Sequence, residues 1–191
     1  MGCCEENEES ECNEYENNIF QVGQKAPEFD EEAYVNGQAK RIKSTDFKGK
    51  WIVLFFYPLD FTFVCPTEIK GFQKSHSEFE KLNSVVVGCS TDSVHSHKAW
   101  FQRDMPEVKF PILADNAHRV SNDYGVLLAE EGIALRGTFI IDPDGVLQYQ
   151  LVSALNVGRS ILETLRVLKA LQTGGLCPVE WSEGQNTLNP K

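Results

Sequence analysis

Continuous apolar runs and amphipathic stretches alternate along this chain of 191 residues. The run WIVLFFY at residues 51–57 is rich in β-branched and aromatic side chains, which predicts a central strand buried on both faces. Residues 84–90 (SVVVGCS) and 110–115 (FPILAD) predict two further buried strands. The segment TFIIDPDGVLQYQLV at residues 138–152 predicts a hairpin whose turn is the DPDG sequence at residues 142–145.

Helical periodicity appears between and after these strands. Apolar residues recur at three- and seven-residue steps after Cys65, which predicts a helix there, and another helix begins with SHKAWFQ at residues 96–102. Residues 159–172 predict a surface helix with one apolar stripe that packs on the sheet and a charged side that faces water. The stripe consists of Ile161, Leu162, Leu165, Leu168 and Leu171, and the charged side carries Glu163, Arg166 and Lys169.

The order of these elements predicts one α/β domain. Strand, helix, strand, helix and strand, followed by a hairpin and a helix, describe a three-layer arrangement around a central mixed sheet. A chain of this length with 41% hydrophobic residues suffices for a single core. We expect a disordered acidic tail at residues 1–18, the domain at 19–173, and an irregular C-terminal arm at 174–191, where QTGGLCPVEW interrupts the periodicity.

The charge of the chain is concentrated at its start. The net charge is −10, but residues 1–18 hold seven glutamates and no lysine or arginine, so the remainder has 21 acids (28 − 7) against 18 bases. Such a balance offers no basic stripe for a nucleic acid. No apolar stretch is long enough to span a membrane, and the start lacks the basic and apolar parts of a signal peptide. We therefore expect a cytoplasmic location, in which cysteines stay as thiols.

Cys65 is the candidate for chemistry, because it lies where the strand at 51–57 gives way to the next helix. Pro66 suits the first helical position and Glu68 the acidic position of a capping box, which predicts that Cys65 is the N-cap. Unpaired N–H groups and the positive end of the helix dipole there favour the thiolate. A buried structural cysteine is the alternative, although it would not require the polar loop PLDFTFVCPTE.

The surroundings of Cys65 restrict its chemistry. A thioredoxin-type dithiol needs a second cysteine three residues later, where Glu68 stands, so Cys65 has no local disulfide partner. A single activated thiol suits attack on a small electrophile such as a hydroperoxide, which converts it to a sulfenic acid that a second thiol can condense with. A papain-type protease needs a partner histidine. The sequence alone assigns that role to none of His76, His95, His97 and His118.

The segment FYPLDFTFVCPTE at residues 56–68 resembles the active-site signature of the peroxiredoxins. Pro58, Thr62 and Cys65 match the Pro-x-x-x-Thr-x-x-Cys motif of that family. LRGTFIIDPDG, NVGRS and CPVEW also match, so the resemblance covers roughly residues 20–184. It points to the typical two-cysteine group, which includes the bacterial alkyl hydroperoxide reductase C component and the thioredoxin peroxidases. The resemblance implies a thioredoxin-like fold and a thiol peroxidase that reduces hydrogen peroxide and organic hydroperoxides.

The resemblance also implies a role for each matching residue. Cys65 would attack the terminal peroxide oxygen, Thr62 would hydrogen-bond the peroxide and the thiolate, and Pro58 would shield the site from water. Arg136 in LRGTF would stabilise the thiolate and the charge that develops as the O–O bond breaks. Cys177 corresponds to the resolving cysteine, which forms an intersubunit disulfide with Cys65.

Glu68 and Arg159 match a supporting acid and arginine of the family. Arg159 falls in the first turn of the predicted helix at 159–172, where a positive charge opposes the helix dipole. A carboxylate partner would explain this placement, so we predict that Glu68 pairs with Arg159. The alternative is an Arg159 side chain that points into solvent.

The remaining cysteines call for no metal or cofactor. Cys89 lies in an apolar run and is predicted to be core packing. Cys3, Cys4 and Cys12 lack the paired spacing of zinc ligands and have no nearby histidine.

The resemblance implies partners as well as chemistry. The expected assembly is a homodimer that forms a decamer, with thioredoxin or a dedicated flavoprotein disulfide reductase as the electron donor. A holdase chaperone or a peroxide-relay partner is the alternative class of function.

Overall fold

A computed structural model describes residues 20–188, and the predicted tail at residues 1–18 lies outside the described residues. The centre of the structure is a seven-stranded sheet in the order β2-β1-β5-β4-β3-β8-β9. Strands β6 and β7 form a separate two-stranded sheet. The strands are β1 (Asp30–Val35), β2 (Gln38–Lys43), β3 (Trp51–Phe56), β4 (Ser84–Ser90), β5 (Ile112–Ala114), β6 (Leu127–Leu128), β7 (Ile133–Ala134), β8 (Arg136–Ile141) and β9 (Leu147–Ser153). The helices are η1 (Ser44–Phe47), α1 (Cys65–Lys74), α2 (His76–Lys81), α3 (Val94–Asp104), α4 (Arg119–Asp123) and α5 (Ile161–Gln172).

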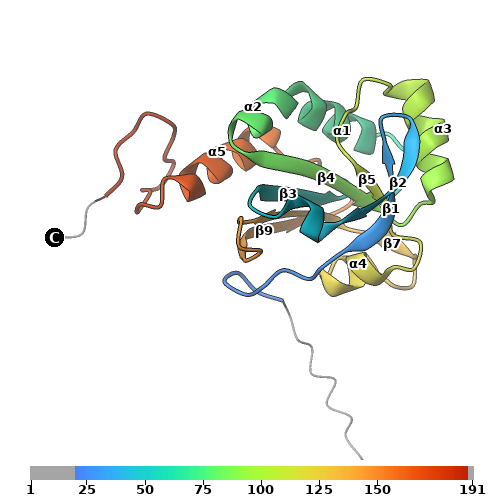
Figure 1. Cartoon of the computed structure of the whole chain (residues 1–191), viewed down its shortest axis with the longest axis horizontal. Helices are drawn as coiled ribbons and strands as arrows, with labels where there is room; N and C mark the ends of the chain where they lie inside the picture. Colours follow the sequence, from blue (N-terminus) through green and yellow to red (C-terminus); the bar gives the residue numbers. More distant parts are fainter. Residues whose placement is uncertain (1–19, 189–191) are drawn as a thin grey trace, which may run out of the picture.

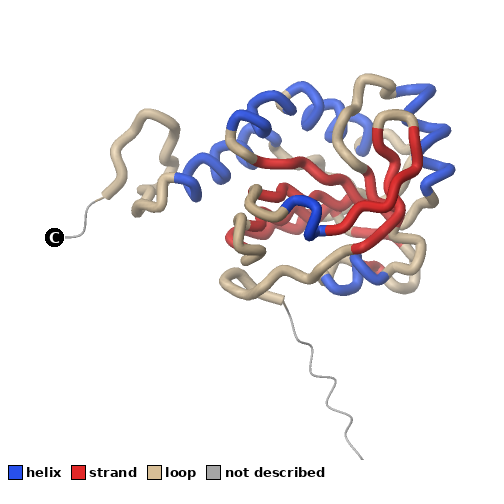
Figure 2. The backbone as a smooth tube through the Cα atoms, viewed as in Figure 1, coloured by secondary structure: helices blue, strands red, loops and turns tan. Residues whose placement is uncertain are grey.

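The sheet is mixed, as predicted, and β3 lies near its middle. β3 runs parallel to β4 and antiparallel to β8, and β4 runs parallel to β5. Figure 2 shows the strands in the interior with helices around them. Among residues 20–188, every helix is too short or too polar to cross a lipid bilayer.

Strand β3 is buried on both faces, which confirms the prediction from its continuous apolar run. Val53 and Phe55 point into a core shared with α1, α2, α3 and α5. Ile52 and Leu54 point into a second core, to which α4 contributes Val120. Figure 1 shows the same layers, with α1, α2 and α3 along one side of the sheet and α4 on the other. The alternation of side chains along a strand explains how one apolar run serves two cores.

The helix predicted after Cys65 is divided in two. The N–H of Ser75 bonds to the carbonyls of both Gly71 and Phe72, which tightens the last turn and ends α1. The helix resumes as α2, and the rings of Phe72 and Phe79 lie 5.9 Å apart in the core. The seven-residue apolar spacing is therefore correct, whereas the continuity of the helix is not.

The predicted hairpin is present as β8 and β9. One oxygen of Asp142 accepts hydrogen bonds from the N–H groups of Asp144 and Val146, each at 2.9 Å. Gly145 has φ +79°, a conformation that glycine adopts without steric cost. The DPDG sequence thus encodes its own turn. In contrast, α4 and the β6–β7 pair are too short to leave a periodic pattern, and the sequence did not predict them.

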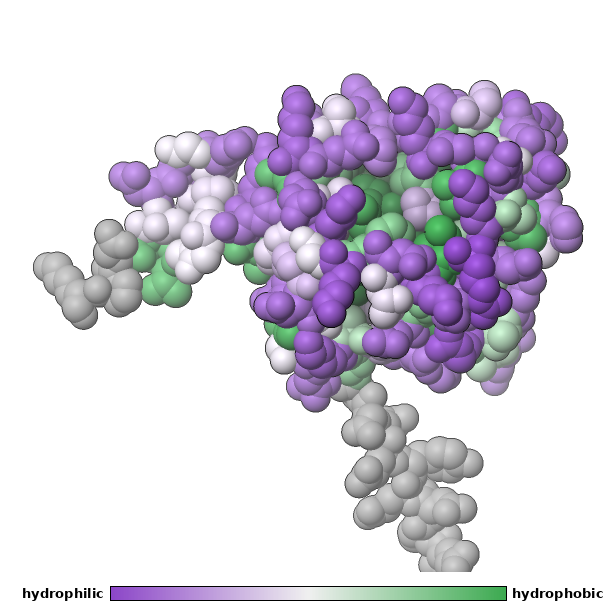
Figure 3. Space-filling model, in the orientation of Figure 1, coloured by the Kyte–Doolittle hydropathy of each residue, from purple (hydrophilic) through white to green (hydrophobic). Residues whose placement is uncertain are grey.

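The C-terminal segment contacts the domain through α5, where Arg166 donates to the carbonyl of Trp181 and Lys169 pairs with Glu183. Residues 173–188 form no helix and no regular strand, although Leu176 and Leu188 pair as an isolated bridge. Figure 3 shows this segment projecting from the body of the molecule, with hydrophobic side chains toward its end. Val179 and Leu176 are 91% and 57% exposed, so the segment carries uncovered apolar surface.

The apolar stripe of α5 differs from the prediction at one position. Leu165 and Leu168 are buried as predicted, whereas Leu162 is 77% exposed. Thr164 and Val167 are buried instead, because the face of α5 that meets the sheet is rotated relative to the predicted stripe.

This difference gives a test with two leucines of one helix. Leu168→Ala should lower the free energy of unfolding by about 2–5 kcal/mol, because it opens a cavity in the core. Leu162→Ala should change it by no more than about 0.5 kcal/mol. Urea unfolding followed by circular dichroism measures both. An equal loss for the two variants would show that Leu162 is covered in solution.

Candidate active site

The junction of β3 and α1 positions Cys65 slightly differently from the prediction. Val64 already has helical backbone angles, φ −78° and ψ −42°, and is the N-cap, so Cys65 is the first residue of α1. The prediction of Cys65 as N-cap is therefore wrong by one residue. Pro66 follows in the first turn, where its missing N–H costs no helical hydrogen bond. The Cys65 side chain is fully buried, at the positive end of the helix.

Glu68 does not form a capping box, because its carboxylate turns to two arginines. Its Oε2 accepts a hydrogen bond from Nη1 of Arg136 at 2.6 Å. Its Oε1 accepts from Nε and from the backbone N–H of Arg159, at 2.8 and 2.9 Å. Glu68 is 3% exposed, so the carboxylate exchanges water for these charged donors. The predicted contact between Glu68 and Arg159 is present.

Arg159 lies outside the helix in which it was predicted. Ser160 is the N-cap of α5, so Arg159 precedes the first helical turn. Its Nη1 donates to the carbonyl of Gly137 at 2.6 Å, and its Nη2 to the carbonyl of Phe56 at 2.5 Å. Burial lowers the pKa of Arg159 from its usual value, and the hydrogen bond and charge of Glu68 oppose that shift.

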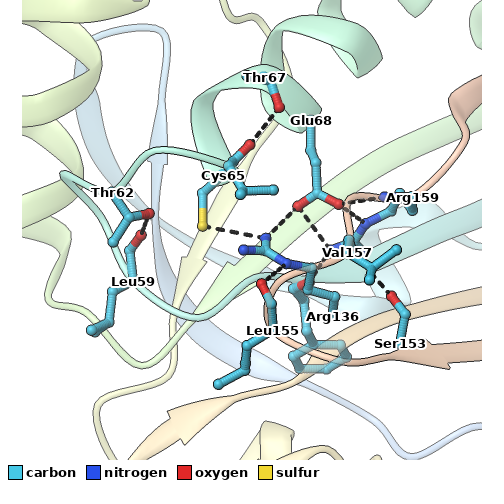
Figure 4. Close-up of polar contacts among 12 residues, drawn as sticks. Leu59, Thr62, Cys65, Thr67, Glu68, Arg136, Ser153, Leu155, Val157 and Arg159 are labelled. Carbon is cyan, nitrogen blue, oxygen red and sulfur yellow. Dashed lines mark hydrogen bonds and ion pairs between the residues drawn. The ribbon is translucent and has the colours of Figure 1, made fainter.

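Arg136 connects the carboxylate to the sulfur. It begins β8, and its Nε donates to the carbonyl of Leu155 at 2.7 Å, which fixes the guanidinium plane. Its Nη1 then lies 3.4 Å from Sγ of Cys65, in addition to its contact with Glu68. Figure 4 shows the resulting row of Cys65, Arg136, Glu68 and Arg159.

The charges of this row leave a net positive charge beside the Cys65 sulfur. Two guanidiniums and one carboxylate leave one positive charge, and the Arg136, Glu68 and Arg159 side chains are each at most 4% exposed. An uncompensated charge in such surroundings is costly. The Cys65 sulfur lies 3.4 Å from Arg136 Nη1 in this row, so the row can stabilise negative charge that develops beside the sulfur during a reaction.

Comparison with known proteins agrees with this chemistry. Residues 22–150 match the AhpC/TSA family. Peroxiredoxin prdx-2 of Caenorhabditis elegans is 48% identical over 178 residues, which cover 88% of this chain and 89% of that protein. The 2-Cys peroxiredoxin BAS1, chloroplastic, of Spinacia oleracea is 48% identical over 179 residues, which cover 88% of this chain and 68% of that protein.

A solved structure extends the likeness to the fold. The reduced 2-Cys peroxiredoxin of Plasmodium vivax matches with a TM-score of 0.85 and 37% identity, over 89% of this chain and 93% of that one. This chain belongs to the AhpC/TSA family of peroxiredoxins. The peroxiredoxin is therefore a thiol-dependent peroxidase with a thioredoxin-like fold, which acts on peroxides and takes electrons from a thiol. The resemblance noted in the sequence is confirmed.

Two motif residues of the peroxiredoxin lie in the loop before Cys65. Pro58 is buried two residues after the end of β3. The hydroxyl of Thr62 donates to the carbonyl of Leu59 at 2.9 Å, so its proton does not go to the Cys65 sulfur (Figure 4). The hydroxyl oxygen keeps its capacity to accept a hydrogen bond.

Cys177 of the peroxiredoxin lies beyond the far end of α5. Its Sγ is 3.4 Å from Oγ1 of Thr173 and 3.6 Å from the carbonyl of Ala170. Helix α5 has 12 residues and a length of about 18 Å. Arg159 precedes this helix and Cys177 follows it, so the structure brings Cys65, Glu68, Arg136 and Arg159 together and leaves Cys177 apart.

Several groups that complete the site carry no sequence signal. The carbonyls of Phe56, Gly137 and Leu155 orient the two arginines, but every residue offers a carbonyl. Their identity follows only from the path of the backbone. Gly137 shows one constraint, because a Cβ there would lie 2.8 Å from side-chain atoms of Val126 and Phe139.

The charge row gives a stability test. Glu68→Gln should lower the free energy of unfolding by about 3–5 kcal/mol, because two buried guanidiniums lose their carboxylate. Chemical denaturation of the reduced protein measures this. The control is Glu163→Gln, which removes the half-exposed partner of Arg166 and should cost no more than about 1 kcal/mol. Equal costs would contradict the assignment of Glu68 as the carboxylate that holds both arginines.

Proposed function

We propose that this peroxiredoxin reduces hydrogen peroxide and organic hydroperoxides with Cys65 as the peroxidatic nucleophile. The observation that carries the proposal is the 3.4 Å contact between Cys65 Sγ and Arg136 Nη1, in a buried row whose other charges sum to +1. Such a site stabilises the thiolate before reaction and the charge that moves onto the leaving oxygen during it. Glu68 and Arg159 hold Arg136 in place.

The first step is a displacement at oxygen. The Cys65 thiolate attacks the terminal peroxide oxygen, an S–O bond forms, and the O–O bond breaks. The leaving alkoxide or hydroxide takes a proton and departs as alcohol or water, while the sulfur becomes a sulfenic acid. Thr62 would accept a hydrogen bond from the peroxide O–H, since its own proton is committed to Leu59. Pro58 would exclude water from the sulfur.

The second step joins two chains. Cys177 of a second copy attacks the sulfenic acid sulfur of Cys65, which releases water and forms an intersubunit disulfide. The length of α5 between the two thiols supports a donor from another copy. Exposed apolar side chains support an interface that includes the edge strand β9. The residues concerned are Leu151, Val152, Val157 and Val179. The proposed assembly is a homodimer that forms a decamer.

An external dithiol closes the cycle. Thioredoxin or a flavoprotein disulfide reductase would supply two electrons and two protons to the disulfide and restore both thiols. The proposed location is the cytoplasm, which keeps thiols reduced between turnovers. The proposed domain organisation is the acidic tail at 1–18, the peroxidase domain at 19–173, and the arm at 174–191 that carries Cys177.

Substitution of each cysteine separates the two steps. Cys65→Ser should abolish peroxide consumption, measured with a dithiol donor in excess, because the nucleophile is lost. Cys177→Ser should still react rapidly with one equivalent of peroxide. Non-reducing gels of this variant should show no disulfide-linked dimer. Cys89→Ala is the matched control, because Cys89 is buried in the second core and should leave both readouts unchanged.

Peroxide consumption by Cys65→Ser at the rate of the unchanged protein would overturn the assignment of the nucleophile. A disulfide-linked dimer that persists in Cys177→Ser would overturn only the assignment of the resolving thiol.

A further inference from the structure

A buried polar cluster lies behind the active-site loop. Asp60, between Pro58 and Thr62, accepts hydrogen bonds from the hydroxyls of Tyr57 and Ser96, each at 2.8 Å. Its Oδ2 also lies 2.8 Å from Nδ1 of His97. The side chains of Asp60 and His97 are both fully buried. The loop is therefore tied through Asp60 to the N-terminal half of α3.

His97 makes a polar contact through each nitrogen of its ring. Nε2 lies 3.1 Å from the carbonyl of Leu113, which only accepts, so Nε2 must donate. Nδ1, on the other side of the ring, faces the Asp60 oxygen at 2.8 Å. The ring thus joins the Leu113 carbonyl of β5 to the active-site loop by two directional bonds. Burial of this pair away from water makes both bonds hard to replace.

The same helix also holds the next residue of the loop. Phe61 has φ +57°, a left-handed conformation that is strained for a side chain of this size. Its ring lies 5.7 Å from the ring of Trp100, and the Arg103 guanidinium lies 5.0 Å above it. His97, Trp100 and Arg103 follow one another at three-residue steps, which places them on one side of α3. That side of the helix therefore fixes two consecutive loop residues.

Thr62 is the residue that follows these two anchors. A cavity of about 470 Å³ opens between the loop, α1 and α3, and its lining includes Thr62, Pro66, Trp100 and Arg103. The backbone N–H of Asp60 donates to Asp92 at 2.9 Å, which adds an anchor on the main chain. A small change in the conformation of this loop would displace Thr62 from its place in the cavity lining.

We propose that His97 is a positioning residue for the peroxidase reaction: it holds Asp60 while Trp100 and Arg103 on the same side of α3 hold Phe61, so that Thr62 meets the peroxide. The proposal rests on the function proposed above, in which Cys65 is the nucleophile and Thr62 orients its substrate. It assigns to α3 a task beyond core packing. The proposed effect of His97 on the peroxide reaction passes through Thr62. Replacement of Thr62 therefore tests the proposal.

The test compares two amides in place of the imidazole. The amide nitrogen of His97→Asn can occupy the position of Nδ1 and retain the bond to Asp60, whereas His97→Gln can reach only the Leu113 carbonyl. His97→Gln should lower the second-order rate constant for hydrogen peroxide by about ten- to hundredfold, as expected for a misplaced catalytic group. His97→Asn should recover most of that loss. His95→Gln, at an exposed position of α3, is the control and should leave the rate unchanged.

A Thr62→Val variant tests whether His97 acts through Thr62. In a Thr62→Val protein, His97→Gln should cause no further loss, because the hydroxyl that it positions is already absent. Alkylation of Cys65 by iodoacetamide, which does not use Thr62, should change by less than about twofold. If His97→Gln lowers the peroxide rate equally in both backgrounds, or lowers alkylation in parallel, the role is structural and the proposal fails.

A milder substitution keeps the test decisive if His97→Gln does not fold. Arg103→Gln removes the cation above Phe61 from a side chain that is 65% exposed, so the fold should tolerate it. Arg103→Gln should lower the rate constant for hydrogen peroxide about two- to threefold in the protein that retains Thr62. In the Thr62→Val protein it should have no effect. An unchanged rate would overturn the proposal. Loss of peroxide consumption in Cys65→Ser, measured alongside, shows that the proposed function itself holds when the positioning role fails.

Discussion

The buried carboxylate of Glu68 is the interaction on which the rest of the site depends. It bonds to guanidiniums from two distant segments, one at the start of β8 and one before α5. Without it, two like charges would lie close together in a region that excludes water. With it, a single positive charge is left next to Cys65. The carboxylate therefore fixes the geometry of the two guanidiniums and lowers the net charge beside the sulfur from +2 to +1.

This constraint explains how the fold serves the site. β3 delivers the chain to the start of α1, β8 supplies Arg136 beside it, and the segment before α5 supplies Arg159. Backbone carbonyls of Phe56 and Gly137 belong to the paired strands β3 and β8 and accept from Arg159. The sheet thus orients the charges directly, and the charges in turn join the ends of three elements.

Much of this arrangement could be predicted from the sequence, and the errors have physical causes. The strand at 51–57 and the DPDG turn follow from apolar runs and turn chemistry, which act locally. The contact between Glu68 and Arg159 was predicted from a charge whose position was slightly wrong, since Arg159 precedes the helix. Val64 as N-cap could not be predicted, because its side chain makes no capping bond. The Asp60–His97 contact joins residues 37 apart, and no periodic pattern marks such a pair.

The function proposed above depends on the Arg136 guanidinium beside the Cys65 sulfur. Stopped-flow measurement of the second-order rate constant for hydrogen peroxide, in the unchanged protein and in Arg136→Met, tests this dependence. We expect Arg136→Met to lower the rate constant by about two to three orders of magnitude, because the charge that forms on the leaving oxygen loses its donor. An unchanged rate constant would overturn the proposed role of Arg136.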